Sequence, residues 1–251
     1  MKGGKMAQGI LYGIGVGPGD PDFITLKAVR ILSQVDIVFA ASSARNTHSQ
    51  AVEIAKPHLK AGVPIQMISF PMIRDKKAME AAWQDNARTV IKVLEQGKNA
   101  AFITLGDCLT YSTYGYVLKH IQKLAPHIEI CSIPGITSYQ AAAARINTPL
   151  VEGEESMMLV SGVTGGDKFR KLSDRADNVV FLKAYRNAHD ITKALDEAGM
   201  ADKSVGIVRC GLEGEQIISD MDVFQKKKPD YWTLIISKKS GLCVQDKKET
   251  E

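Results

Sequence analysis

Three short loops that contain glycine hold the residues whose types and spacing could do chemistry. Residues 13–19 include four glycines and Pro18, residues 106–112 begin with Gly-Asp, and residues 134–138 begin with Pro-Gly. Because glycine has no Cβ, the backbone can turn tightly and lie close to a ligand. This composition is typical of a site that holds a small molecule against the main chain. Each loop taken alone could also be an ordinary turn between a strand and a helix.

The first loop departs from both common phosphate-binding patterns. The dinucleotide pattern G-x-G-x-x-G needs a glycine where Pro18 or Asp20 stands, and no acidic residue for a ribose ends the second expected strand. The phosphate loop needs Gly-Lys before Ser or Thr, and the sequence has no such triplet. The sequence therefore predicts a small-molecule site of another kind.

The cysteines and histidines lack the spacing of a metal centre. None of the four cysteines belongs to a C-x-x-C pair, and the five histidines have no ligand-like spacing with cysteines or carboxylates. No Ser-His-Asp or Cys-His constellation stands out either. No signal peptide and no apolar run long enough for a bilayer are recognisable. We therefore expect a cytoplasmic protein with unpaired thiols and no bound metal.

Length and charge narrow the class of protein further. The 251 residues are 45% hydrophobic, which is enough for one large domain or for two of modest size. The formal net charge of +4 suits an acidic small-molecule ligand and does not favour nucleic acid or a membrane surface as partner. The lysine run 226–228 is interpreted as ordinary solvated surface.

Strand-like and helical patterns alternate over a first domain that we predict to span residues 1–147. Apolar runs predict strands at residues 10–16, 36–40, 64–70, 99–105 and 128–133. Helices are expected near residues 22–33, 48–60, 75–96, 111–124 and 137–146. Such alternation predicts a mostly parallel five-stranded sheet, whose ligands lie beyond the carboxyl ends of the strands. All three glycine loops follow expected strands, so we expect them at one edge of the sheet.

A second domain is predicted over residues 148–251, and it begins with Thr148-Pro149 and an acidic stretch, residues 152–155, which are interpreted as a hinge. Strands are expected near residues 156–161, 178–183, 204–209, 215–219 and 231–237. Helices fit residues 167–175 and 188–198. Several strands follow one another closely, which predicts a mixed, partly antiparallel sheet.

Three stretches of the chain together resemble the tetrapyrrole methylases: GVGPGDPDFITLKA, LGDCLTYSTYGY and SIPGITSYQAAAARINTPLVEGEE. The resemblance implies two α/β domains, S-adenosylmethionine in a cleft between them with the second domain as a lid, and a homodimer. Within the family, LTYST and AAAARINTPLVEGEE are most similar to enzymes that methylate the C-20 meso carbon of precorrin-2 or cobalt-factor II in cobalamin biosynthesis. One position departs from the pattern, because Cys108 stands where many members have proline.

The resemblance also implies which residues hold the cofactor. In the first domain, Pro18 would border the cleft, and the methionine side of the cofactor would be lined by Gly106, Asp107, Tyr111 and Ser112. Thr137 and Ser138 would contact the cofactor from the end of the fifth strand. In the second domain, the adenosine would be enclosed by Ala184, Tyr185, Cys210, Gly211, Tyr231, Trp232 and Thr233.

The implied reaction needs few catalytic side chains. The methyl sulfonium is reactive and the meso carbon of the substrate is the nucleophile, so the main task of the protein is alignment. One proton must leave the methylated carbon, and Asp107 is the candidate base, with Tyr231 a lesser candidate. Candidate cations for the carboxylates of the substrate follow the second and third strands, although such residues are often only solvated surface: Arg45, Arg74 and Lys76.

Two other functions stay open at this point. The chain could be a methyltransferase of the same fold with another substrate, such as another precorrin, diphthine or ribosomal RNA. It could also be a non-catalytic carrier of a tetrapyrrole or nucleotide. The mild net charge counts against RNA.

Overall fold

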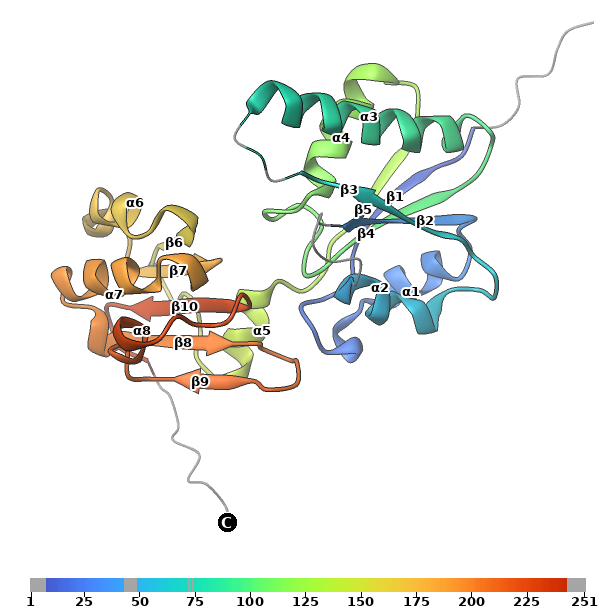
Figure 1. Cartoon of the computed structure of the whole chain (residues 1–251). Coiled ribbons are helices and arrows are strands. Elements are labelled where there is room, and N and C mark those ends of the chain that lie inside the picture. Colours follow the sequence, from blue (N-terminus) through green and yellow to red (C-terminus); the bar gives the residue numbers. More distant parts are fainter. Residues whose placement is uncertain (1–7, 43–48, 72, 74, 243–251) are drawn as a thin grey trace, which may run out of the picture. The chain divides into compact units, whose positions relative to one another are not determined.

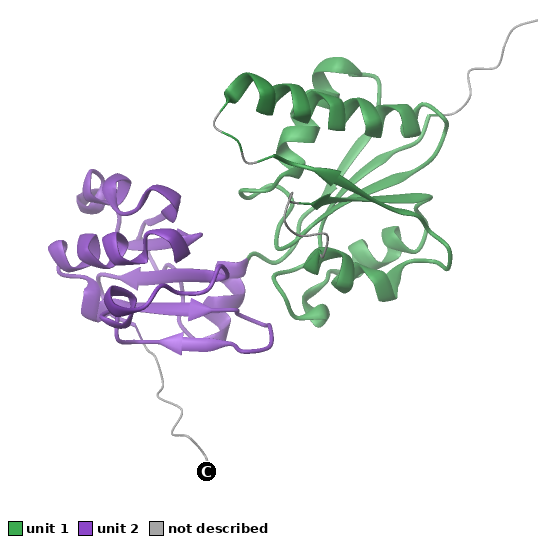
Figure 2. Cartoon of the chain, viewed as in Figure 1, with its two compact units in different colours: residues 1–137 green, residues 138–251 purple. Residues whose placement is uncertain are grey.

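The computed structural model describes residues 8–42, 49–71, 73 and 75–242, and the chain folds as two compact units, residues 1–137 and 138–251 (Figure 2). The sequence predicts a domain boundary after residue 147 instead. Between the two positions lies α5, Ser138–Arg145, which contacts strand β10 of the second unit. The division into functional domains stays a prediction.

The first unit contains a five-stranded sheet in the order β3-β2-β4-β1-β5, and every neighbouring pair is parallel (Figure 1). The parallel sheet predicted from the alternation is confirmed. Four strands are shorter than expected because the terminal residues of each run leave the ladder, whereas β2 ends two residues later than expected. The strands are β1 Leu11–Gly15, β2 Ile37–Ser42, β3 Ile65–Ser69, β4 Ala100–Thr104 and β5 Ile130–Ile133.

Helices cover both faces of this sheet, with α1 and α2 on one face and α3 and α4 on the other (Figure 1). Each face has its own core, and both cores are built from alternating residues of the same strands. The helices are α1 Leu26–Leu32, α2 Gln50–Ala55, α3 Lys76–Leu94 and α4 Tyr114–Leu124, with short 3₁₀ turns at Pro21–Phe23 and Lys56–His58.

Two helices of the first unit begin later than predicted, for local reasons. The helix expected from residue 22 starts as a 3₁₀ turn and becomes α1 only at Leu26, where the Thr25 hydroxyl accepts a hydrogen bond from Ala28 N at 3.3 Å. The helix expected from residue 111 starts at Tyr114, because Tyr111 adopts a left-handed φ of 50° that no helix tolerates.

The second unit contains the mixed sheet that the sequence predicts, and its strands lie in the order β6-β7-β10-β8-β9. The β6–β7 pair is parallel, and β10 runs antiparallel to both of its neighbours, β7 and β8. The strands are β6 Met157–Ser161, β7 Asn178–Leu182, β8 Ser204–Val208, β9 Gln216–Ile218 and β10 Thr233–Lys238.

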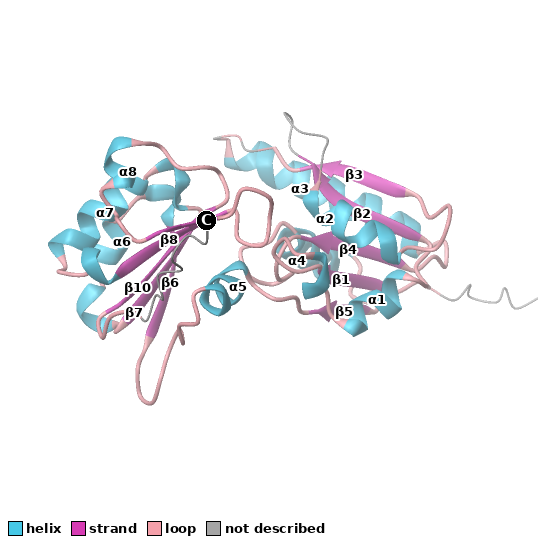
Figure 3. Ribbon diagram, turned by 90° about the horizontal axis from the view of Figure 1, so that it is seen from below, coloured by secondary structure: helices cyan, strands magenta, loops and turns pink. Residues whose placement is uncertain are grey.

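Helices α6, α7 and α8 cover one face of this sheet, and α5 lies on the other (Figure 3). The helix α6, Asp167–Arg170, is shorter than predicted and continues as a 3₁₀ turn at Ser173–Arg175. The helix α7 spans Ala188–Glu197, close to the prediction. No sequence pattern predicts α8, Val223–Lys226, because a single turn is too short to show periodicity. Further 3₁₀ turns occur at Gly162–Thr164, Ala184–Arg186 and Ala201–Lys203.

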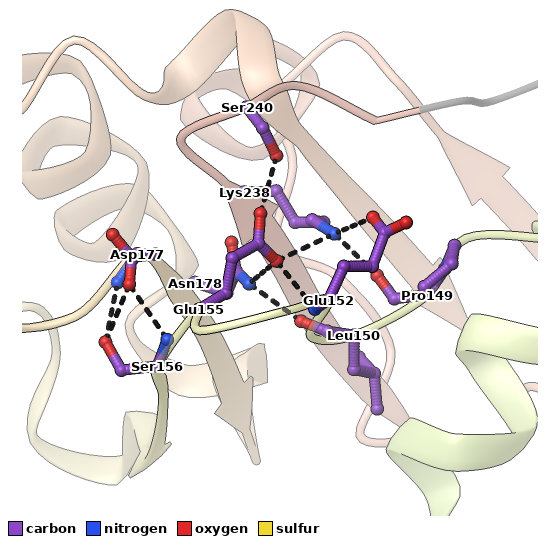
Figure 4. A network of polar contacts seen from close by, with 9 residues as sticks. All are labelled: Pro149, Leu150, Glu152, Glu155, Ser156, Asp177, Asn178, Lys238 and Ser240. Atoms are coloured by element: carbon purple, nitrogen blue, oxygen red, sulfur yellow. Dashed lines mark hydrogen bonds and ion pairs between the residues drawn. The ribbon is translucent and has the colours of Figure 1, made fainter.

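The acidic stretch interpreted as a hinge is bound to the second sheet by a buried lysine (Figure 4). The Lys238 Nζ donates to Pro149 O at 2.9 Å and to Glu152 Oε2 at 3.0 Å, and lies 3.3 Å from Glu155 Oε2. The Asn178 amide donates to Leu150 O and to Glu155 Oε2. This segment is therefore fixed against the start of β7 and the end of β10.

Candidate functional site

The three glycine loops of the first unit meet at one edge of its sheet. They follow β1, β4 and β5, which are neighbours in the parallel sheet. Gly17 N donates to Gly106 O at 3.2 Å, and Gly106 N donates to Gly17 O at 2.6 Å. A Cβ on Gly15 would lie 2.5 Å from Gly106 O and 2.7 Å from Gly135 N. We call the meeting point of residues 15–18, 106–107 and 134–135 the backbone shelf.

The glycines of the backbone shelf allow the loops to pack directly against one another. Neither Gly15 nor Gly135 has room for a Cβ, because each faces the Gly106 carbonyl. Gly106 itself has a φ of +72°, which L side chains rarely adopt. Pro18 is buried in the first loop. The sequence predicted glycine for closeness to a ligand; the structure adds closeness between loops as a separate reason.

The Asp107 carboxylate joins two of these loops. Its Oδ1 accepts hydrogen bonds from Leu109 N at 2.9 Å and from the Thr110 hydroxyl at 3.0 Å. Its Oδ2 accepts one from Gly135 N at 3.1 Å. Both oxygens therefore hold the loop after β4 in shape and fasten it to the loop after β5. Asp107 is a positioning residue in this geometry, whatever else it does.

Cys108, the departure from the family pattern, fixes the same loop by its side chain. It is fully buried, and its Sγ donates to Ile133 O at 3.3 Å. Burial, and then the neighbouring Asp107 carboxylate, raises the pKa of the thiol to about 11. A thiol with that pKa is protonated at neutral pH, so Cys108 stabilises the loop and is a poor nucleophile.

The remaining predicted cofactor residues of the first loops have mixed exposure. Tyr111 is 47% exposed, in the left-handed conformation already noted. The Ser112 hydroxyl accepts a hydrogen bond from Tyr114 N at 3.1 Å, just ahead of the N-cap residue Thr113 of α4. Thr137 is buried at the end of the first unit, and Ser138 is the first residue of α5. Tyr111 is therefore exposed, Ser112 and Ser138 are half-buried, and Thr137 is buried.

At one edge of the second sheet, the structure collects the residues that the resemblance implied for the adenosine. Because β10 runs antiparallel to β7 and β8, its first residue lies beside their last ones. Thr233 pairs with Val208, and Arg209 N donates to Trp232 O at 2.9 Å. The residues that meet at this edge are Ala184, Tyr185, Cys210, Gly211, Tyr231, Trp232 and Thr233.

A carboxylate that the sequence did not single out orders one loop at this edge. Glu215 Oε2 accepts a hydrogen bond from Gly211 N at 2.8 Å, and Glu215 Oε1 accepts one from Arg145 Nε. Cys210, beside them, is buried, and burial followed by the Glu215 charge raises the pKa of its thiol to about 11. No local pattern links positions 145 and 215, since only the fold brings them together.

Three aromatic side chains lie side by side at the same edge. The ring centroids of Tyr185 and Tyr231 are 4.8 Å apart, and those of Tyr231 and Trp232 are 4.9 Å apart. Partial burial, and then the Tyr185 hydroxyl, raises the pKa of Tyr231 above its ordinary value. Its phenol is therefore neutral at neutral pH, which suits a hydrogen-bond donor better than a base.

Three cations are predicted from the sequence to bind the carboxylates of the substrate. Arg45 and Arg74 lie outside the described residues. Lys76 is exposed as the first residue of α3.

Two absences concern only the part of the chain that the structure describes. There, no three histidine, cysteine or acidic side chains come close enough together to hold a metal ion. Nor does any described helix have the length and apolar character needed to cross a membrane.

Comparison with known proteins identifies relatives along most of the chain. The model of the family described as Tetrapyrrole (Corrin/Porphyrin) Methylases matches residues 10–221. The cobalt-precorrin-2 C(20)-methyltransferase of Salmonella typhimurium is 31% identical over 92% of this chain and 97% of its own length. The cobalamin biosynthesis protein CobIJ of Mycobacterium tuberculosis is 32% identical over 91% of this chain, which spans about half (46%) of that protein.

A solved structure shows the same fold at lower identity. The uroporphyrin-III C-methyltransferase of Thermus thermophilus, solved in complex with S-adenosylhomocysteine, superposes with a TM-score of 0.64. It is 20% identical, and the match covers 92% of this chain and 97% of that chain. The two-sheet α/β architecture is therefore that of the tetrapyrrole methylases.

Proposed function

The chain belongs to the tetrapyrrole methylase family, and we propose that it transfers the methyl group of S-adenosylmethionine to C-20 of precorrin-2 or cobalt-factor II in cobalamin biosynthesis. The choice of C-20 is supported by the Salmonella typhimurium relative, a cobalt-precorrin-2 C(20)-methyltransferase that matches over nearly its whole length. The C-20 position rests on 31% identity, and the methyl donor rests on the family.

The observation that carries the proposal is the backbone shelf. Three loops held to one another by main-chain contacts form a rigid edge with few side chains, as a site for aligning two small molecules requires. Alignment of donor and acceptor can contribute about 7–11 kcal/mol to lowering the barrier. The buried thiols near the predicted cofactor residues fit this chemistry, because the meso carbon of the substrate supplies the electron pair and the protein needs no nucleophile.

The final step is loss of a proton from the methylated carbon. We propose Asp107 as its acceptor, with Tyr231 as the lesser candidate. The hydrogen bonds of Asp107 to Gly135 N and Leu109 N mean that its replacement also loosens the shelf. The neutral phenol of Tyr231 makes it the weaker base.

We also propose that the protein is a cytoplasmic homodimer and that the donor lies between the two domains. Light scattering of the purified chain tests the dimer. The position of the donor is tested by a crystal structure with S-adenosylhomocysteine; a site remote from the backbone shelf would contradict the proposal.

The decisive experiment uses purified protein, S-adenosylmethionine carrying a ¹³C-labelled methyl group, and either precorrin-2 or cobalt-factor II. We expect a product one methyl group heavier, with the label on C-20 by NMR, and no product without the donor. Label on another carbon would make the chain a methylase of different regiospecificity. Binding without any mass change would make it a carrier. Methylation of diphthine precursor or ribosomal RNA alone would replace the tetrapyrrole as substrate.

A further inference from the structure

An exposed patch on the second unit combines aromatic rings with cations. Tyr231 and Trp232 are 56% and 39% exposed, and their rings meet edge to face at 88°. Tyr185 lies beside Tyr231, and two cations lie over its ring: the Arg186 guanidinium at 5.5 Å and the Lys228 ammonium at 6.0 Å. We call these five residues the aromatic–cation platform.

The cations of the platform are held in place without being neutralised. Arg186 Nε donates to the Tyr185 hydroxyl at 2.6 Å, which leaves its charge uncompensated. Within the described part of the chain, neither Arg186 nor Lys228 forms an ion pair with a carboxylate. The nearest acidic side chain in the sequence, Asp230, accepts from Trp232 N and lies 3.9 Å from Arg209. The patch therefore keeps a positive charge beside an apolar surface.

We propose that the aromatic–cation platform is the subsite that receives the carboxylate-bearing conjugated ring of the substrate. This inference rests on the proposed function and adds to it the residues that hold the ring. Exposed aromatic faces can stack on a flat macrocycle, and a guanidinium and an ammonium can pair with the carboxylates at its rim.

Charge separates this occupant from the methyl donor. S-adenosylmethionine carries a sulfonium and an ammonium against one carboxylate, so two uncompensated cations repel it. A ring with several carboxylates is attracted by the same two charges. The platform thus assigns Tyr185, Tyr231 and Trp232 to the substrate, although the resemblance implied the adenosine for all three. It also gives a function to Lys228, in a lysine run that the sequence suggested was only solvated surface.

The fluorescence of Trp232 provides a direct readout. The chain has two tryptophans, Trp83 and Trp232, so the variant Trp83→Phe reports on Trp232 alone. The probe is uroporphyrin, a stable porphyrin with carboxylates around its rim, titrated into the full-length protein. We expect quenching that saturates, and an affinity that falls as salt rises, because the pairing is partly electrostatic.

The charge variant Arg186→Gln/Lys228→Gln, in the same background, tests the cations. Exposed ion pairs change affinity by about two- to fivefold each, so the dissociation constant for uroporphyrin should rise roughly four- to 25-fold. The control variant Arg175→Gln/Lys119→Gln removes the same charge from exposed positions elsewhere and should leave that constant unchanged. Far-ultraviolet circular dichroism establishes that all variants are folded.

Two results would overturn the platform. One is an equal dissociation constant for uroporphyrin in the charge variant and the control. The other is a charge variant that binds S-adenosylhomocysteine more weakly while binding uroporphyrin normally, which would make the patch part of the cofactor site. Failure of the proposed function looks different: uroporphyrin would still bind at Trp232, but incubation with precorrin-2 and the donor would give no methylated product.

Discussion

The strand-end edges of the two units are built by opposite means. In the first unit, loops approach backbone to backbone, and neither Gly15 nor Gly135 has room for a Cβ. In the second unit, the corresponding edge is filled by side chains, with three aromatic rings and an ion pair between Arg145 and Glu215. Each edge uses one carboxylate to hold a glycine amide, Asp107 for Gly135 and Glu215 for Gly211. The comparison teaches that a rigid edge can come from the absence of side chains or from their mutual packing.

The largest effect is expected where the first edge has no spare volume. Gly15→Ala places a Cβ 2.5 Å from Gly106 O, so the loops must separate. We expect a loss of about 1–3 kcal/mol in the free energy of unfolding and loss of donor binding. Urea denaturation and calorimetric titration with S-adenosylhomocysteine measure the two effects.

The matched control is Gly115→Ala in α4, where a Cβ would meet nothing within 4 Å. Alanine favours a helix over glycine, so this variant should be as stable as the original or more so. Equal stability of Gly15→Ala and Gly115→Ala would show that the shelf tolerates side chains and would remove the contrast between the edges.

The next effect concerns the carboxylate of the first edge. Asp107→Asn leaves one acceptor oxygen for three hydrogen-bond donors. We therefore expect the affinity for S-adenosylmethionine to fall about tenfold and the free energy of unfolding to fall by roughly 1–2 kcal/mol. Asp85→Asn, on the exposed surface of α3, is the control. If Asp107 is also the base, kcat should fall by about 10²–10⁴-fold. An unchanged kcat at saturating S-adenosylmethionine would show that Asp107 only positions the loops and is not the base.

A smaller effect is expected from the carboxylate of the second edge. Glu215→Gln keeps one acceptor for Gly211 N or Arg145 and removes the charge, while the packed rings and paired strands around the loop remain. We expect the free energy of unfolding to fall by about 1 kcal/mol or less, and the affinity for S-adenosylmethionine to change less than in Asp107→Asn. Glu213→Gln, exposed in the same loop, is the control. A larger loss than for Asp107→Asn would reverse the ranking of the two edges.

The smallest effect is expected at the last residue of β10, at the end of the second sheet away from the three aromatic rings. The hydrogen bond from the Asn178 amide is the main cause that holds the pKa of Glu155 below its ordinary value near 4.5; burial opposes it, and the smaller effect of Lys238 adds to the lowering. The stabilisation is therefore present above that value and is lost as pH falls through the lower folded pKa. Denaturation midpoints from pH 7 downward should show this acid-side loss, and Glu155→Gln should lessen it. Glu154→Gln, which is exposed, should keep the full pH dependence.

The sequence by itself determined the order and kind of most elements. Periodicity and glycine loops predicted the strands of both sheets to within a few residues, because alternating burial imposes a pattern on neighbouring positions. The same local signals placed Gly106, Asp107 and Gly135 at strand ends, where a parallel sheet gathers ligands.

Only the tertiary structure decided what those residues touch. A Cβ at Gly15 would clash with loops that start about 90 and 120 positions later in the chain. Likewise, Glu215 binds Arg145 across a separation of 70 residues. The aromatic–cation platform exists because β10 runs antiparallel beside β7, which brings Tyr231 to Tyr185. Contacts between distant segments leave no pattern within a short window, so composition and spacing could name the participants but not their partners.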